Sequence, residues 1–168
     1  MSAIHRKAAI CDANVLIDYV KADEAVLAML AGYWGIVFVP DVVLSEVQQL
    51  SANRARSLGL TIIETPLSMA DVAGLSFPDR ACLYFATREG WVCIANDRRL
   101  RNECKSRGIQ TVWGLEMLLL LVQSDTLAEP RARRVAMKIH AENPQITRKV
   151  LDDFIGKLDQ RTRSRKQP

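Results

Sequence analysis

Two short apolar segments, each ending at an aspartate, constrain this chain more than any other feature. The segment AAIC ends at Asp12 and is followed by the helix-like stretch NVLIDYV, and the segment WVCIAN ends at Asp97 and is followed by RRLRNECKSRG. A strand that leads directly into a helix is the repeating unit of an α/β fold, and the carboxyl ends of parallel strands meet along one edge of the sheet. We therefore expect the Asp12 and Asp97 carboxylates at the same edge.

The rest of the chain alternates in the same way. Strands are expected at 7–11, 36–39, 60–64, 91–95 and 109–113, and helices at 14–21, 23–31, 41–52, 68–73, 78–89, 98–107, 114–123, 130–141 and 147–159. Thr147 is the expected cap of the last helix, with Ile146 and Leu151 as a hydrophobic staple. The pattern predicts an α/β fold with a central parallel sheet and an added C-terminal helical extension.

Two further acids fall on predicted apolar helix faces. Glu46 shares the helical spacing of Val43, Val47 and Leu50, and Asp79 shares that of Cys82, Leu83 and Ala86. A carboxylate that faces the core must be protonated, paired or bound to a metal. Four such carboxylates in one place would repel one another, and a divalent cation would remove that repulsion.

Each of the four acids also has a purely structural interpretation. Asp12 and Asp97 are good helix caps, and Asp79 is the third residue of a capping box that Ser76 opens. Glu46 becomes an ordinary surface residue if its helix is rotated from the expected phase. The residues taken one at a time therefore leave both interpretations open.

Composition excludes several classes of protein. The 168 residues are 49% apolar, which fits one globular domain with a real core. No stretch reaches the roughly 18 apolar residues that a membrane span needs, and the first residues lack the apolar segment of a signal peptide. We therefore expect a cytoplasmic protein without a membrane partner. The four cysteines form no CxxC pair and only two histidines are present, so we expect buried, reduced thiols and no structural zinc site.

The positive charge lies in the C-terminal part of the chain. Residues 128–168 contain 11 Lys and Arg against 5 Asp and Glu, whereas the chain as a whole has a net charge of +4. A basic arm suggests a polyanionic partner, and a solvated tail without a role is an equally good interpretation. The expected organisation is a core domain at 1–125, a packed helical extension at 126–160 and a disordered basic tail at 161–168. The charge of this tail is carried by Arg161, Arg163, Arg165 and Lys166.

The order and spacing of the four acids resemble those of the PIN-domain nucleases, including VapC-like toxin ribonucleases. The resemblance runs from about residue 7 to residue 122, and the segment from Asp79 to Asp97 is its most diagnostic part. The matching segments are AAICDANVLIDYV, VPDVVLSEVQQL, LSFPDRACLYFATREGWVCIANDRRLR and GIQTVWGLEMLL. The resemblance implies a three-layer α/β/α fold with an acidic pocket at the carboxyl ends of the strands. It also implies endonucleolytic cleavage of single-stranded RNA that depends on Mg²⁺ or Mn²⁺.

The chemistry of the four acids agrees with that activity. Hard divalent cations prefer oxygen ligands, so Asp12, Asp79 and Asp97 are the expected metal ligands. Glu46 completes the catalytic quartet, where it would hold a second metal or orient the attacking water. Three arginines flank the acids and are expected either to contact RNA phosphates or to be solvated helix residues: Arg80, Arg98 and Arg99. Because many bacterial PIN proteins are toxins of toxin–antitoxin pairs, the resemblance also implies an antitoxin-like protein partner and a homodimer.

The chain departs from the family pattern at two positions. Ala13 and Ala95 stand where the family usually has Thr or Ser, whose hydroxyls would orient carboxylates and waters. Asn14 and Asn96 are the nearby donors that would act in this supporting role, and Asp18 is expected to be an exposed helix residue. These departures favour a second hypothesis, a catalytically weak or inactive PIN-like module that binds RNA or protein. A phosphatase of the haloacid dehalogenase type is a third class, which Asn14 disfavours because that class needs Asp there.

Overall fold

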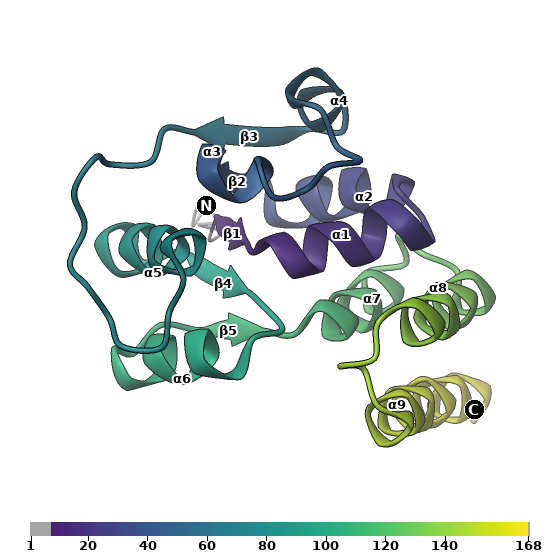
Figure 1. Ribbon diagram of the computed structural model, residues 1–168. Helices are drawn as coiled ribbons and strands as arrows, with labels where there is room; N and C mark the ends of the chain where they lie inside the picture. Colours follow the sequence, from purple (N-terminus) through teal and green to yellow (C-terminus); the bar gives the residue numbers. More distant parts are fainter. Residues whose placement is uncertain (1–7, 168) are drawn as a thin grey trace, which may run out of the picture.

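A five-stranded, all-parallel sheet forms the centre of the molecule (Figure 1). The computed structural model describes residues 8–167. The strand order is β3-β2-β1-β4-β5, so the sheet grows outward from β1 in one direction and from β4 in the other. The order reverses between β1 and β4, and α/β folds bind their ligands at such a reversal. The strands are β1 (Ala9–Cys11), β2 (Val37–Pro40), β3 (Leu60–Ile63), β4 (Val92–Ile94) and β5 (Thr111–Val112).

Helices cover both faces of the sheet, and this confirms the expected three-layer α/β/α fold. On one side lie α1 (Ala13–Ala22), α2 (Ala25–Trp34) and α7 (Gly114–Gln123) (Figure 1). On the other side lie α5 (Phe77–Glu89) and α6 (Arg98–Ser106), which contact each other. The two central strands are fully buried along their length, which explains why their sequences are continuous apolar runs rather than alternating ones.

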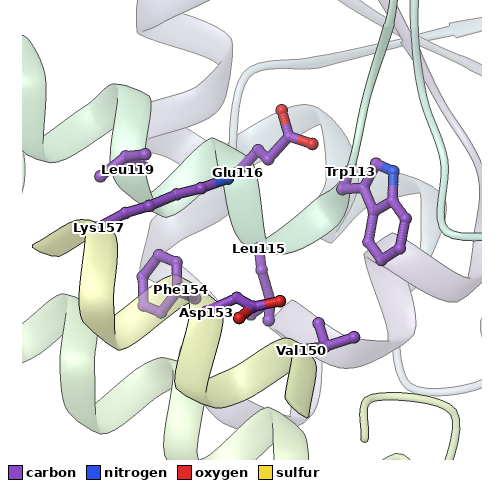
Figure 2. Close-up of a pocket in the computed structure, with 8 residues that line it drawn as sticks. All are labelled: Trp113, Leu115, Glu116, Leu119, Val150, Asp153, Phe154 and Lys157. Atoms are coloured by element: carbon purple, nitrogen blue, oxygen red, sulfur yellow. The ribbon is translucent and has the colours of Figure 1, made fainter.

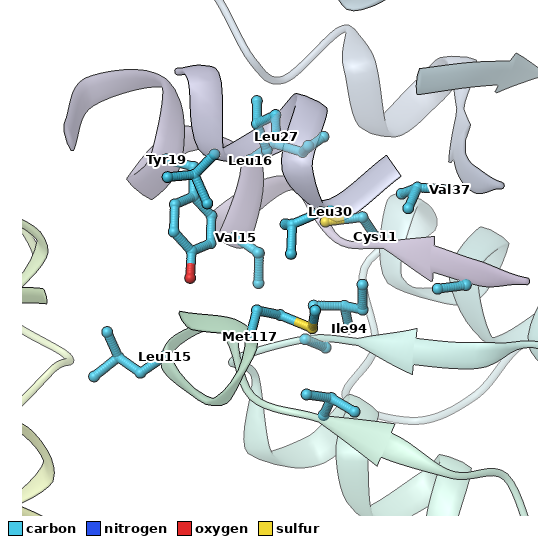
Figure 3. Packing of buried hydrophobic residues seen from close by; sticks show 14 of the residues in the cluster. Cys11, Val15, Leu16, Tyr19, Leu27, Leu30, Val37, Ile94, Leu115 and Met117 are labelled. Carbon is cyan, nitrogen blue, oxygen red and sulfur yellow. The ribbon is translucent and has the colours of Figure 1, made fainter. Parts of the chain in front are cut away.

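The core between α1 and the sheet fixes where α1 begins. Figure 3 shows Val15, Leu16 and Tyr19 of α1 directed toward side chains of α2, β4 and α7. All three are fully buried, and truncating Leu16 to Ala would cost about 2–5 kcal/mol. The Tyr19 hydroxyl donates a hydrogen bond to the carbonyl oxygen of Gly114 at the start of α7. This contact holds α1, and with it the strand-to-helix junction at Asp12, against the start of α7, which follows the edge strand β5.

The region expected to be one helix at 41–52 is divided. Helix α3 (Asp41–Leu44) ends after four residues, and a separate helix α4 (Ala52–Ser57) follows. Between them the chain makes turns in which Val47 N–H donates to the Leu44 carbonyl and Leu50 N–H donates to the Val47 carbonyl. These four-residue turns keep Val47 and Leu50 buried without continuing the helix. The short helix expected at 68–73 is also absent, because these residues lie in the loop between β3 and α5.

Two helices form the C-terminal extension, α8 (Glu129–Glu142) and α9 (Arg148–Lys166). Helix α8 contacts α1 and α7, and α9 contacts α7 and α8. The expected cap is present, since the Val150 N–H donates to Thr147 Oγ1 at 3.3 Å. No helix within residues 8–167 is both long enough and apolar enough to cross a membrane.

The basic tail is helical where the sequence suggested disorder. Helix α9 continues through Lys166, and of the expected tail at 161–168 only Pro168 lies outside the described residues. Arg161 Nη2 donates to the Gln123 carbonyl at 3.1 Å, and Arg165 Nη2 lies 2.6 Å from Asp125 Oδ1. These contacts hold the end of α9 against the loop between α7 and α8. Arg161 and Arg165 therefore already have partners within the molecule.

Candidate active site

Asp12 occupies the centre of the carboxyl edge of the sheet. Its backbone N–H donates to the Ile94 carbonyl at 3.0 Å, which joins the end of β1 to the end of β4. Its Oδ1 caps α1 by accepting from the Ala13 N–H at 2.7 Å. Asp12 is only 2% exposed, and among residues 8–167 its buried Oδ2 has no hydrogen-bond partner. Capping and ligand binding are therefore compatible, because they use different oxygens of one carboxylate.

Asp97 repeats this arrangement on the neighbouring strand. It follows β4 and caps α6, with Oδ1 accepting from the Leu100 N–H at 2.8 Å. Because Cys11 and Ile94 are paired in the β1–β4 register, Asp12 and Asp97 leave adjacent strands where the strand order reverses. The Asp97 side chain is half-buried. One of its carboxylate oxygens is thus fixed by the helix, as in Asp12.

Asp79 and Glu46 approach the same edge from the other side. Asp79 lies in the first turn of α5, which contacts β1 and β4, and its N–H donates to Ser76 Oγ at 3.2 Å. Its side chain is half-buried. Glu46 lies in the turn after α3 and is exposed, so its expected place on a buried helix face was wrong. The helix that would have carried it inward ends at Leu44.

The four acids act on one another electrostatically. The pKa of Asp12 is raised to about 7, mainly by burial and next by the charge of Asp79, with smaller contributions from Asp97 and Glu46. Burial, together with the charge of Asp97, also raises the pKa of Asp79. Burial and the charge of Asp79 raise the pKa of Glu46. These mutual effects require the carboxylates to lie near one another.

One proton relieves part of this repulsion. A proton on Asp12 removes its charge, and with it the repulsion from Asp79 that raises the Asp12 pKa. When Asp12 is ionised, its buried Oδ2 has no hydrogen-bond partner among the described residues. A buried charged oxygen in that state is costly unless a cation or donor reaches it.

The donor set fits a hard divalent cation. Within residues 8–167, no three His, Cys, Asp or Glu side chains already surround a common metal position. Mg²⁺ usually needs only one or two protein carboxylates, because waters and substrate phosphates fill its other positions. Asp12 with its unpartnered oxygen, and Asp97 beside it, meet that requirement.

The expected supporting residues have other contacts. Asn14 is exposed on the first turn of α1. Asn96 does not bond to the acids: its Oδ1 accepts from the Gly114 N–H at 3.0 Å, and its Nδ2 donates to Asp18 Oδ2 at 3.2 Å. Asp18 is buried rather than exposed, and it also accepts from Asn143 of the extension. Asn96 can therefore influence its neighbour Asp97 only by fixing the loop that both share.

Arg101 is a residue that the sequence-based interpretation missed. Its guanidinium carbon lies 3.8 Å from the centre of the Trp113 ring, its side chain is 7% exposed, and its Nε has no partner. Burial lowers its pKa, while the charges of Glu116 and Asp97 partly oppose that shift. The signal was available, because Arg101 follows Asp97 by four residues and precedes the buried Cys104 by three. Figure 2 shows Trp113 at the end of a groove of about 220 Å³ between α7 and α9.

The arginines expected to bind RNA differ in exposure and in whether they already contact a partner within the molecule. Arg80 Nη1 lies 2.6 Å from Asp71 Oδ1, and Arg99 Nη1 is 3.5 Å from the Gly74 carbonyl. Arg98 is exposed on α6 directly after Asp97. On α9, Arg163 and Lys166 are exposed. Arg98 thus combines exposure with proximity to an acid of the site.

Comparisons with known proteins support the fold. No protein-family model matches the chain, and no curated protein matches it. Among solved structures, the chain is similar to a PilT N-terminus domain protein from the hyperthermophilic archaeon Sulfolobus solfataricus P2, with a TM-score of 0.53 and 15% sequence identity. The match covers 67% of this chain and 91% of the archaeal one. The PIN-like fold expected from the sequence is therefore confirmed, and about a third of this chain lies outside the match.

Proposed function

We propose that this protein is a metal-dependent endoribonuclease that cleaves single-stranded RNA through Asp12, Glu46, Asp79 and Asp97. The observation that carries the proposal is the buried, unpartnered Oδ2 of Asp12, at the reversal point of a PIN-like sheet and opposed by three other acids. A protein would not maintain this arrangement for stability alone, because each like charge destabilises the folded state.

The roles of the acids follow from their burial. Asp12 and Asp97, each with one oxygen held by a helix N-terminus, are the fixed ligands of Mg²⁺ or Mn²⁺. Asp79 is half-buried and adds a direct or water-mediated contact. Glu46 is exposed in a turn, and it accepts a proton from the attacking water. When bound, the cation would lower the pKa of a water and stabilise charge on the phosphodiester.

Cations around the acids hold the RNA. Arg98 is exposed beside Asp97 and contacts a phosphate, and Arg80 and Arg99 exchange their present partners for phosphates when RNA is bound. Arg101 is buried against Trp113 and offsets the negative charge of Asp97. The exposed Arg163 and Lys166, with Arg161 and Arg165, add attraction for the polyanion at a distance from the cut.

The test compares wild-type protein with three variants. Metal-free protein receives Mn²⁺ or Mg²⁺ in the presence of single-stranded RNA, double-stranded RNA or single-stranded DNA. With metal, wild-type protein and the Asp152→Asn control should cut the single-stranded RNA, whereas Asp12→Asn and Asp97→Asn should not. Asp152→Asn is the matched control, because Asp152 is an exposed acid on α9. If Asp12→Asn and Asp152→Asn cut equally, the activity belongs to a contaminant and the proposal is wrong.

A second candidate function is supported by Ala13 and Ala95. Both are buried and lack the hydroxyl groups that PIN nucleases usually have there. Asn96, the nearest substitute, already bonds to Gly114 and Asp18. In this alternative the chain binds RNA or protein without cutting. RNA binding by wild-type protein without cleavage at any metal concentration would favour it.

The cellular role that we propose is that of a toxin, supported by the resemblance to VapC-like proteins. Induced expression should arrest growth for wild-type protein and not for Asp12→Asn. We also propose a homodimer and an antitoxin-like partner. Light scattering of the purified protein gives the mass that tests the homodimer, and release of growth arrest by a co-expressed neighbouring small gene tests the partner.

A further inference from the structure

A polar cavity of about 250 Å³ lies between α1 and the loop that joins α8 to α9. One wall is a single face of α1, formed at the i, i+3, i+4, i+7 spacing by Asn14, Ile17, Asp18 and Lys21. The other wall is residues 142–145 of the extension. Because Asn14 lies two residues after Asp12, the cavity begins within the first turn of the helix that Asp12 caps.

The two walls are joined by a partly buried hydrogen-bond network. Asn143 Nδ2 donates to both oxygens of Asp18, at 3.0 and 3.1 Å, and Asn143 Oδ1 accepts from the Gln145 N–H at 2.9 Å. Asn96 Nδ2 donates to the same carboxylate. The cavity is thus preformed, and the loop that shapes it is linked through Asp18 to the residue next to Asp97.

Two further contacts keep this part of the extension on α1. Arg131 of α8 makes two hydrogen bonds to the Asp23 carboxylate at the end of α1, at 2.8 and 3.1 Å. At the other side of the network, a Cβ on Gly114 would lie 2.9 Å from Asn96 Oδ1. Glycine is therefore required where α7 begins for Asn96 to reach Asp18.

The lining of the cavity is mixed, and this indicates the kind of ligand. Ile17 and Pro144 supply apolar surface, and the Asn14 and Gln145 amides supply donors and acceptors. Lys21 adds an ammonium to the lining, and the Glu142 carboxylate would oppose a bare phosphate. A nucleobase has apolar faces and an edge of donors and acceptors, which amide side chains read well.

We infer that this cavity is a subsite for one nucleotide of single-stranded RNA next to the cleaved phosphodiester, and that the C-terminal extension thereby sets the sequence preference of the protein. This inference rests on the proposed function. Gln145 contacts the base edge and Lys21 contacts the phosphate of that nucleotide. Asn143 is a positioning residue, because its amide is fully used in holding the loop to Asp18.

The first experiment measures RNA binding without cleavage. A short fluorescent single-stranded RNA is titrated with the full-length protein in Ca²⁺ at several salt concentrations. Gln145→Ala should weaken binding about 3–10-fold, the range for one lost hydrogen bond. Lys21→Ala should weaken binding and reduce the slope of log K against log salt by about 0.7, the value for one phosphate contact on a single strand.

Matched controls remove the same side chains elsewhere. Lys105→Ala removes an exposed lysine from α6, and Gln110→Ala removes an exposed glutamine before β5. Lys21 and Gln145 are themselves exposed, so unchanged melting temperatures are expected for all four variants. Cavity variants that bind RNA no more weakly than these controls would overturn the subsite.

The second experiment separates the subsite from the nuclease activity. Cleavage of a random-sequence single-stranded RNA in Mn²⁺ is mapped for wild-type protein and for Gln145→Ala. The variant should cut with a raised KM and an unchanged kcat, and with relaxed preference at one nucleotide beside the cut. If wild-type protein cuts and Gln145→Ala gives the same sites and KM, the subsite is wrong and the nuclease proposal stands. If wild-type protein does not cut, the nuclease proposal fails and the binding series alone decides the subsite.

Discussion

Asp12 and Asp18 belong to the same helix and are both buried, yet their surroundings are opposite. Asp18 accepts hydrogen bonds from the amides of Asn96 and Asn143, which oppose the upward shift of its pKa by burial. Asp12 has one oxygen held by the helix, one without a partner, and three acids nearby. The comparison shows how to separate a structural buried acid from a functional one. Asp18 is satisfied by donors in the fold, whereas we propose that a bound cation satisfies Asp12.

The end of the same helix offers a third case. Asp23 is paired with Arg131, and hydrogen bonding to that guanidinium lowers the Asp23 pKa. Along one helix, therefore, an acid is unsatisfied at the start, satisfied by amides in the middle and ion-paired at the end. Substitutions at these three positions should therefore change the free energy of unfolding by different amounts and in different directions.

The largest expected effect is on activity at the start of the helix. Asp12→Asn keeps the cap, because Asn caps helices as well as Asp does, but it removes a ligand of the cation. The variant should lose several kcal/mol of the transition-state stabilisation that the cation supplies, which should slow RNA cleavage at least ~10³-fold. The measurement is single-turnover cleavage in Mn²⁺. A loss of less than tenfold would mean that Asp12 is not a functional acid and would remove the contrast with Asp18.

The same substitution should stabilise the metal-free protein. The pKa of Asp12 in the folded state is about 7, above the value of about 3.9 expected when unfolded. The folded state therefore binds more protons between these values, and stability falls as the pH rises from about 4 to about 7. At pH 8, Asp12→Asn should raise the free energy of unfolding by roughly 2–4 kcal/mol, and the gain should disappear near pH 4.

Urea unfolding at several pH values in EDTA measures this gain. Adding Mn²⁺ at pH 8 should stabilise wild-type protein more than the variant, since the cation replaces the missing proton. An Asp12→Asn protein that is less stable than wild type at pH 8 without metal would contradict the view that Asp12 is a strained, unsatisfied acid.

The middle of the helix should respond with the opposite sign. Asp18→Ala leaves the amide donors of Asn96 and Asn143 without their acceptor, and each such buried group costs about 1–3 kcal/mol. Thermal and urea unfolding should therefore show destabilisation, with Asp152→Ala as an exposed control. If the loss is no larger than that of the control, waters replace the carboxylate and the extension is not held by this contact.

The smallest effect is expected at the end of the helix. The side chains of Asp23 and Arg131 are 21% and 37% exposed, so the ion pair contributes at most about 1 kcal/mol. Its pH dependence is opposite to that of Asp12: a lowered pKa stabilises the fold above the unfolded pKa and is lost as the pH falls below about 4. Asp23→Asn should thus reduce stability slightly at pH 7 and by less at pH 3. Equal losses at both pH values would show that packing, not charge, is removed.

Local signals in the sequence predicted most elements, and they failed where turns replaced a helix. The residues 41–52 have helical spacing, but the turns at Val47 and Leu50 bury the same apolar side chains with a different backbone. Glu46 does lie near Asp79, as expected, but it lies there in an exposed turn and not on a buried helix face. The basic tail was expected to be disordered because its composition is polar, whereas contacts with Gln123 and Asp125 continue the helix.

The sequence by itself determined the strand-to-helix junctions, because a buried apolar strand and a capping aspartate are decided within a few residues. It thereby determined that Asp12 and Asp97 follow strands that end at the same edge of a parallel sheet. Only the tertiary structure decided which acids are satisfied. Asn143 is 125 residues from Asp18 in the chain, and Arg131 is 108 residues from Asp23. No local pattern records such a partner, since the burial of a side chain depends on what packs over it.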